Sequence, residues 1–298
     1  MKKIYAGVER LKIELKALNR CGELPAYTSQ YTRIVSTVAN GIQTLCKEKK
    51  SFVNLASALK SQGITAKSDI RDDLLYSALN NGDWDCDTLS FLVFDILREL
   101  GVKSKIILVA EHVFIGTENG YFETTNGQFY PTQNALPVHK KIRYYKGSDV
   151  KQIQAITYHA LGHYHERSRN EGLLYRAALK FGLEEHFDRS LACYNEAVKR
   201  IPKYAVAYNS RGNRHRTYYN NFQQAIKDYA KSITFDSNFF KAYINRGRAY
   251  VQIKRFDKAK IDLELASEHT DDQEEKKEIE ENLAYVNSQL SKLKNSTI

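Results

Sequence analysis

Apolar residues recur at three- and four-residue intervals along most of the chain, and this is the spacing of one face of an α-helix. A clear stretch covers residues 89–100, and Gly101 comes directly after it at the position of a helix C-cap. In the N-terminal half the pattern predicts helices over residues 4–18, 27–46, 52–59, 69–79 and 89–100. It also predicts a helix that begins near residue 152 and another over residues 274–293.

The pattern changes to that of a β-sheet after the last of these N-terminal helices. Runs of β-branched residues and alternating residues predict short strands over residues 103–110, 112–116 and 121–125. Asn119-Gly120, between the last two strands, is typical of a hairpin turn. We therefore expect residues 1–150 to form an α+β domain, in which helices pack against a small antiparallel sheet.

The C-terminal half of the chain repeats itself. Alignment of Ala207–Asn213 with Ala242–Arg248 gives a period of 35 residues, and alignment of Ala225 with Ala259 gives 34. This period, with small residues at fixed places, is the signature of the tetratricopeptide repeat (TPR), in which each repeat is a pair of helices. The chain therefore resembles TPR proteins, and the resemblance implies an all-α solenoid.

The TPR resemblance implies three repeats over residues 171–272, the first with a degenerate opening helix, and a capping helix with a tail over residues 273–298. Residues 151–170 are either a connecting helix or a divergent repeat, because Tyr158–His163 is similar to the first helix of a repeat. His159 and His163 are four residues apart and could share a metal ion. We favour histidines on the surface or in the groove of a repeat.

A cysteine, a histidine and a carboxylate occur in that order in the N-terminal half. Cys86 stands at the expected start of a helix, His112 opens an expected strand 26 residues later, and Glu123 lies in the return strand. A thiol needs a nearby base to act as a nucleophile at neutral pH, and that base needs a third group to fix its orientation. These three residues are candidates for a catalytic triad.

The triad requires a particular strand register. Positions 112 and 123 share a face of an antiparallel hairpin when residues of opposite parity are paired. A two-residue turn at Asn119-Gly120 meets this condition but leaves the two positions about four residues out of register, roughly 13 Å along the strand. A looser turn or a bulge is therefore required to bring them together.

The order of these residues resembles the transglutaminase-like branch of the papain-like cysteine enzymes, in particular bacterial transglutaminase-like proteins that carry a C-terminal repeat domain. The segments that carry the resemblance are Cys86–Ser90, Glu111–Phe114 and Phe122–Gly127. The resemblance implies that Cys86 is the nucleophile, His112 the base and Glu123 the orienting acid. The other cysteines, which lack a comparable histidine and are expected to be small buried hydrophobes, are Cys21, Cys46 and Cys193.

Four side chains of the repeats are candidates for a binding site. In TPR proteins the first helix of each repeat lines the concave surface. By resemblance to that family, positions three before and one after each repeat glycine point into it. This selects Asn209 and Asn213 around Gly212, and Ile244 and Arg248 around Gly247, with Arg216 one turn further along, and the four polar residues among these are the candidates. Asparagine can bond a peptide backbone, and arginine can hold a carboxylate in a bidentate pair. The alternative is that these are solvated residues and the repeats pack against the cysteine domain.

Length, composition and charge indicate the number of domains, the cellular location and the class of binding partner. The chain has 298 residues, 42% hydrophobic and 27% charged, as in a soluble globular protein with two domains. The sequence contains no apolar run of transmembrane length and no signal-peptide pattern, and its four cysteines lack a disulfide framework, so we expect the cytoplasm. Residues 151–270 contain 21 Lys and Arg against 12 Asp and Glu but no recognised nucleic-acid motif. We therefore expect a protein or peptide partner, possibly acidic, rather than nucleic acid or a membrane.

Two functions stay open. In the first, Cys86 attacks a carboxamide or peptide carbonyl, His112 protonates the leaving nitrogen, and water or an amine resolves the thioester, as in a peptidase, a deamidase or a transamidase. The repeats would recruit the protein substrate. In the second, the cysteine domain is catalytically idle and the chain is an interaction scaffold. The complete Cys-His-Glu set favours the enzyme, which is the main prediction. Glu in place of the commoner Asp, and the lack of Gln before Cys86, favour the scaffold as the alternative. No cofactor is expected for either function.

Overall fold

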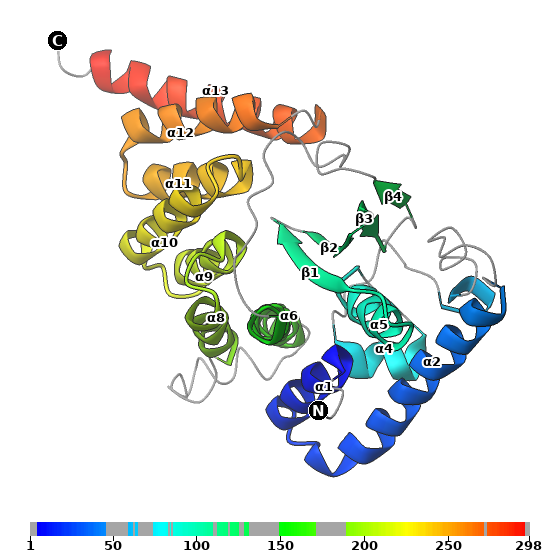
Figure 1. Cartoon of the computed structure of the whole chain (residues 1–298). Coiled ribbons are helices and arrows are strands. Elements are labelled where there is room, and N and C mark those ends of the chain that lie inside the picture. Colours follow the sequence, from blue (N-terminus) through cyan, green and yellow to red (C-terminus); the bar gives the residue numbers. More distant parts are fainter. Residues whose placement is uncertain are drawn as a thin grey trace. The chain divides into compact units, whose positions relative to one another are not determined.

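The structure is a computed structural model that describes residues 5–45, 59–61, 63–64, 74–82, 84, 86–109, 112–118, 120–124, 128–130, 149–170, 189–270 and 273–295. The chain forms two compact units, Met1–Ile201 and Pro202–Ile298 (Figure 1). Within the described ranges, no helix combines the length and the hydropathy that a bilayer span needs.

Helices dominate the described part of the first unit, as the apolar pattern predicts. They are α1 (Ala6–Ala17), the 3-10 helix η1 (Cys21–Glu23), α2 (Leu24–Leu45), α4 (Leu75–Asn81), α5 (Cys86–Glu99), α6 (Asp149–Asn170) and α8 (Arg189–Arg200). Gly101 lies just beyond α5 with a φ of +73°, and the N–H of Val102 donates to the Leu97 carbonyl, which confirms the predicted C-cap. Most of the helix predicted over 52–59, and the start of the one predicted over 69–79, lie outside the described residues.

One antiparallel sheet comes after α5 in the chain. Its strands, in spatial order, are β1 (Ser104–Val109), β2 (His112–Thr117), β3 (Gly120–Glu123) and β4 (Gln128–Tyr130). The first three confirm the predicted strands. The sequence pattern does not predict β4, because three residues are too few to establish an alternation.

The turn between β2 and β3 lies one residue earlier than predicted. Thr117 is paired with Gly120, so residues 118 and 119 connect the strands instead of Asn119-Gly120. The Thr117 hydroxyl donates to the Gly120 carbonyl at 3.1 Å. Gly120 has a φ of +141°, which a residue with a Cβ rarely adopts. Glycine is therefore suited to this position, the first of β3, where it pairs with Thr117.

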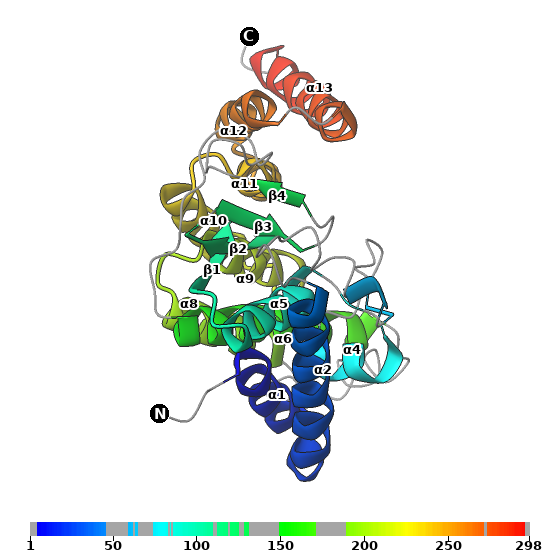
Figure 2. The same cartoon turned by 45° about the vertical axis from the view of Figure 1, so that its right-hand side comes forward.

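Helix α5 lies between the sheet and the helices α1 and α2 (Figures 1 and 2). Every residue from Thr88 to Leu97 is buried, so this part of the helix is covered on all sides. Thr88, Ser90 and Asp95 are its polar members. Buried polar side chains are almost always hydrogen-bonded, and Ser90 and Asp95 make such bonds to neighbouring elements.

Asp95 caps α1 from the side. Its carboxylate accepts hydrogen bonds from the N–H groups of Ala6 (2.8 Å) and Gly7 (2.9 Å) and from the Tyr31 hydroxyl (2.9 Å). The N-cap residue of α1, Tyr5, makes no side-chain cap of its own. Burial raises the pKa of Asp95 to about 6, although the two backbone donors oppose the rise. This single carboxylate therefore joins α5 to both α1 and α2.

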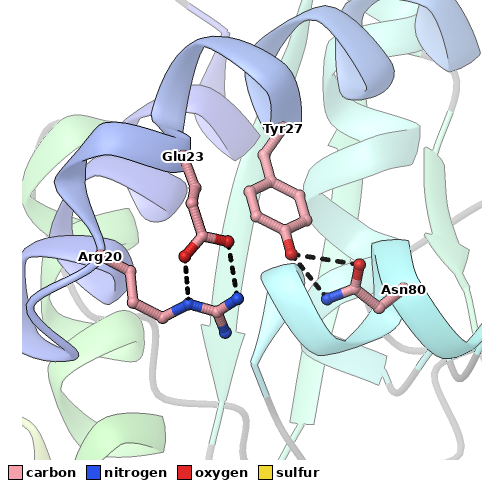
Figure 3. Close-up of polar contacts among 4 residues, drawn as sticks. All are labelled: Arg20, Glu23, Tyr27 and Asn80. Carbon is pink, nitrogen blue, oxygen red and sulfur yellow. Dashed lines mark hydrogen bonds and ion pairs between the residues drawn. The ribbon is translucent and has the colours of Figure 1, made fainter.

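Two polar contacts fix the start of α2 (Figure 3). Arg20 forms two hydrogen bonds of 2.6 Å to the carboxylate of Glu23. The Tyr27 hydroxyl accepts from the Asn80 amide nitrogen at 2.7 Å and lies 3.1 Å from the amide oxygen. The second contact joins α2 to α4, the short helix that precedes Cys86 in the sequence.

The described cysteines differ in burial. Cys193 is buried in α8, as predicted, and packs with Leu74, Ala160 and Leu161. Cys21 is exposed, so the prediction is wrong for this residue, because it stands in the short 3-10 turn η1, in which no residue is buried. Cys46 lies outside the described residues.

Helices α6 and α8 pack against each other, and α6 also packs against α1. A Cβ at Gly162 of α6 would lie 2.3 Å from the ring of Tyr194 in α8, so only glycine permits this approach. Residues 171–188, which connect the two helices, lie outside the described residues, and the opening helix predicted for the first repeat falls there.

The described residues of the second unit form α9 (Ala205–Thr217), α10 (Phe222–Phe235), α11 (Phe240–Gln252), α12 (Phe256–His269) and α13 (Gln273–Asn295). α9 pairs with α10 and α11 with α12, while α10 packs on α11 and α13 on α12. A Cβ at Gly212 would lie 2.7 Å from the Tyr229 ring, and one at Gly247 would lie 3.3 Å from the Leu263 side chain. The small residues of the repeat signature therefore permit close helix contact, and α13 confirms the helix predicted over residues 274–293.

Candidate functional site

Two buried ion pairs recur at equivalent places in the α9–α10 and α11–α12 hairpins. Arg211 donates two hydrogen bonds to Asp228 (2.8 and 2.6 Å), and Arg246 donates two to Asp262 (2.8 and 2.7 Å). Both aspartates are buried, and both arginines directly precede the repeat glycine. These two cations hold helix pairs together and are engaged within the protein.

Asn209, a predicted binding residue, lies in a hydrogen bond between two repeat helices. The Asn245 amide nitrogen in α11 donates to the Asn209 amide oxygen in α9 at 3.0 Å, and both side chains are buried. This bond joins the two helices that carry the other predicted binding residues. Asn209 is therefore a buried residue that joins α9 to α11, rather than a side chain free to contact a peptide.

Tyr229 links Asn213 to Arg216. Its hydroxyl donates to the Asn213 amide oxygen at 2.8 Å and accepts from the Arg216 Nε at 3.3 Å. Burial raises the pKa of Tyr229 to about 12, while the positive charge of Arg216 opposes the rise. The phenol is therefore protonated at neutral pH and holds both side chains on the α9–α10 hairpin.

Arg248 in α11 is half-buried, as Arg216 in α9 is, and these two cations with the Tyr229 hydroxyl form what we call the cationic surface. Burial lowers the pKa of Arg248, and the positive charge of Arg216 lowers it further. Arg248 forms an ion pair with Glu278 of α13, and the charge of Glu275 favours its cation as well. Arg216, Arg248 and the Tyr229 hydroxyl thus provide cations and a hydrogen-bonding group on neighbouring helices of one unit.

The predicted triad positions lie on three elements of the first unit. Cys86 is the first residue of α5, His112 the first of β2 and Glu123 the last of β3. Phe114 is paired with Glu123, so positions 112, 114 and 123 fall on one face of the sheet. The register leaves position 112 two residues from the partner of Glu123, half the offset of an Asn-Gly turn. For Cys86 and His112 the structure describes the place of the residue in its element but not the side chain.

Ser90 ties the start of α5 to the two strands. Its hydroxyl lies 2.9 Å from the Thr124 hydroxyl and donates to the Val113 carbonyl at 3.4 Å. Both hydroxyl residues are buried. Val113 and Thr124 are the residues directly after positions 112 and 123, so the strand ends that carry the predicted base and acid meet the second turn of α5.

The histidines of α6 lie side by side. The Nε2 atoms of His159 and His163 are 3.3 Å apart, and both rings contact Tyr194, with centroid distances of 5.8 and 5.6 Å. Burial, and then the charge of His163, lowers the pKa of His159 well below its ordinary value. No group of three or more His, Cys, Asp or Glu in the described part of the chain is placed to hold a metal ion. Through their contacts with Tyr194, both rings take part in the packing of α6 on α8.

Sequence comparison identifies one repeat directly. The sequence profile of the tetratricopeptide repeat family matches residues 240–268, which contain α11 and nearly all of α12. Residues 240–268 therefore match the profile of one tetratricopeptide repeat. This repeat carries Arg248, the Arg246–Asp262 ion pair and Asn245, and α9–α10 repeats its glycine and its ion pair.

A curated relative is similar over a short stretch. The protein SGT1 homolog of Oryza sativa subsp. japonica is 29% identical to this chain over 83 residues, which are 28% of this chain and 22% of that protein. The chain therefore spans about a fifth of the length of this relative.

Several solved structures of TPR domains are also similar. The TPR2B domain of yeast Sti1, in a pHsp70 complex, has a TM-score of 0.36 and 21% identity, and covers 46% of this chain and 98% of its own. The second TPR domain of human RPAP3, in complex with the HSP70 peptide SGPTIEEVD, has values of 0.34 and 20%, with the same coverage. The TPR2AB domain of yeast Sti1, in a pHSP90 complex, has values of 0.33 and 15%, and covers 91% of this chain and 84% of its own. The transglutaminase-like resemblance stays a prediction.

The sequence analysis does not predict three residues that contact or support Arg216 and Arg248, namely Tyr229, Asn245 and Glu278. Tyr229 lies on the second helix of its repeat. Asn245 lies next to Ile244, which the glycine rule selects but which is buried in the core of the α11–α12 hairpin. Glu278 belongs to the capping helix, which the rule does not consider. One signal does point to Glu278: residues 273–283 contain five glutamates and two lysines, next to a strongly basic stretch.

Proposed function

We propose that the chain is a protein-interaction scaffold whose repeats bind an acidic peptide. The observation that carries the proposal is the pair of half-buried cations, Arg216 and Arg248, beside the hydroxyl of Tyr229. Partial burial strengthens the attraction of a cation for a carboxylate. A guanidinium group can bind a carboxylate through two parallel hydrogen bonds. Adjacent acidic side chains, or a free C-terminal carboxylate, are the groups that suit this surface.

The distribution of charge supports the same partner. Residues 205–262 contain twelve Lys and Arg and four Asp. Arg211 and Arg246 are neutralised by Asp228 and Asp262, and the remaining cations leave a positive potential that steers an acidic peptide toward the surface.

We infer that α6 and α8 form a further, divergent repeat. Gly162 faces Tyr194 across this hairpin as Gly212 faces Tyr229 across α9–α10. Residues 151–170 then belong to the opening helix of a repeat rather than to a connecting helix. On this proposal the repeat region begins near residue 149, and residues 171–188 are an insertion between its first two helices.

A binding measurement tests the proposed function. The probe is the fluorescein-labelled peptide SRMEEVD, the HSP90 peptide that is bound in a solved structure of the second TPR of Spaghetti (RPAP3). Fluorescence anisotropy with the full chain should show saturable binding. The double variant Arg216→Glu/Arg248→Glu should bind roughly tenfold more weakly or worse, because each substituted side chain then repels the carboxylates of the peptide.

The matched control is Lys227→Glu/Lys254→Glu, which makes the same change in net charge at two exposed lysines of the same unit. This variant should retain most of the affinity. Equal loss in both double variants would mean that net charge alone attracts the peptide, and the proposed surface would be wrong.

A second candidate function, cysteine-dependent acyl transfer, is favoured by the register of β2 and β3. That register puts positions 112 and 123 on one face, and Ser90 links the strand ends to α5. In this proposal Cys86 is the nucleophile, His112 the base and Glu123 the orienting acid. A thiol beside such a base is partly ionised at neutral pH and reacts faster with alkylating agents.

Alkylation by iodoacetamide at pH 7, combined with peptide mapping, tests the second candidate. Cys86 should react faster than Cys21, which is exposed, and His112→Ala should slow Cys86 while leaving Cys21 unchanged. If His112→Ala leaves the rate at Cys86 unchanged, His112 is not its base and the triad is refuted.

A further inference from the structure

The ion pairs of the second unit are of two kinds. In Arg211–Asp228 and Arg246–Asp262 the side chains are 14% and 0%, and 19% and 4%, exposed. In Arg248–Glu278 they are 38% and 41% exposed. The first two pairs are shielded from solvent and exchange poorly with a ligand. In the third both side chains are partly exposed, although the Glu278 Oε1 atom of the pair is itself buried, and pairs between partly exposed side chains contribute little to stability.

Glu278 is delivered to Arg248 by the packing of the capping helix. The next residue, Ile279, is fully buried, and with Val286 it packs α13 against the core of the α11–α12 hairpin. Glu275 lies three residues earlier, on the same side of the helix as Glu278. Its charge also acts on Arg248. One cation of the peptide-binding surface therefore already has two carboxylates from the same chain beside it.

We propose that the first turns of α13 are an internal acidic ligand of the repeat surface. Glu278, assisted by Glu275, binds Arg248 in the place of a peptide carboxylate, and an incoming acidic peptide must displace it. The proposal rests on the proposed function and adds its regulation: the affinity for acidic peptides is set by competition with α13. Neutralising Glu278 therefore strengthens peptide binding, although it removes an ion pair.

The competition can be measured with one substitution and one matched control. Glu278→Gln removes the competing charge and keeps the size of the side chain. Glu281→Gln, on an exposed residue of the same helix, changes the net charge equally. Binding of labelled SRMEEVD is measured by anisotropy with the full chain, and the thermal unfolding midpoint verifies that each variant is folded. Glu278→Gln should bind roughly two- to fivefold more tightly than wild type, as expected for loss of an exposed ion pair, and Glu281→Gln should match wild type.

The outcomes separate the inference from the function on which it rests. Tighter binding by Glu278→Gln alone supports the inference, and so does binding by this variant when wild type does not bind. Binding by wild type with no gain in Glu278→Gln over Glu281→Gln overturns the inference and leaves the proposed function intact. Failure of all three proteins to bind overturns the proposed function, and the inference with it.

Discussion

At the scale of the residue, Asp95 makes the stability of the first unit depend on pH. Its folded-state pKa, about 6, lies above the ordinary value of 3.8, so the folded protein holds this proton more tightly than the unfolded chain does. The stability that Asp95 contributes is therefore complete below pH 3.8 and is lost as the pH rises through 6. The whole difference in pKa corresponds to about 3 kcal/mol.

Asp95→Asn should remove this dependence. Between pH 4 and pH 7, the free energy of unfolding of wild type should fall by about 2 kcal/mol relative to the variant, since the unfolded carboxyl is already partly ionised at pH 4. Urea unfolding monitored by the fluorescence of Trp84, the one tryptophan of the chain and a buried residue of the first unit, measures it. The matched control is Glu118→Gln, on an exposed turn residue of the same unit, which should run parallel to wild type. Parallel profiles for wild type and Asp95→Asn would contradict the prediction.

At the scale of the element, the sequence predicts the features that depend on local periodicity. The helix α5, with Gly101 as its C-cap, shows its pattern and its end within a short stretch, and the capping helix α13 does the same. Gly212 and Gly247 recur with the repeat period, so their role in close helix contact is also predictable. In each case the signal lies within one helix or one repeat.

Contacts between elements that are distant in the sequence are not predictable in this way. The turn between β2 and β3 is displaced by one residue from Asn119-Gly120, because the pairing of whole strands outweighs a local turn preference. Asn245 of α11 donates a hydrogen bond to Asn209 of α9, 36 residues earlier in the chain, and α8 packs against α6 although 18 residues separate the two helices in the sequence. The candidate binding surface is consequently predicted only in part: Arg216 and Arg248 are selected by the repeat pattern, whereas Tyr229 and Glu278 require the packed structure.

At the scale of the whole molecule, a basic stretch and the acidic first half of α13 carry opposite charge. Residues 205–255 carry ten cations and two anions, and residues 273–283 carry five anions and two cations. In the proposed exchange, a peptide that displaces Glu278 replaces one ion pair of Arg248 by another. The net gain in ion pairs on binding is then one fewer than the number of ion pairs that the peptide forms, because the Arg248–Glu278 pair is lost.

This exchange predicts how salt changes the affinity for SRMEEVD. Ion pairs at exposed groups weaken as ionic strength rises, since the Debye length falls from about 10 Å at 0.1 M salt to about 3 Å at 1 M. In wild type, salt weakens the pair that forms and also the pair that is broken, so the dissociation constant should rise gently between 50 and 500 mM NaCl. In Glu278→Gln no pair is broken, and the rise should be steeper. Glu281→Gln carries the same net charge and should keep the gentle slope of wild type. Equal slopes for the two glutamine variants would mean that binding exchanges no ion pair at Arg248, whatever the affinities at low salt.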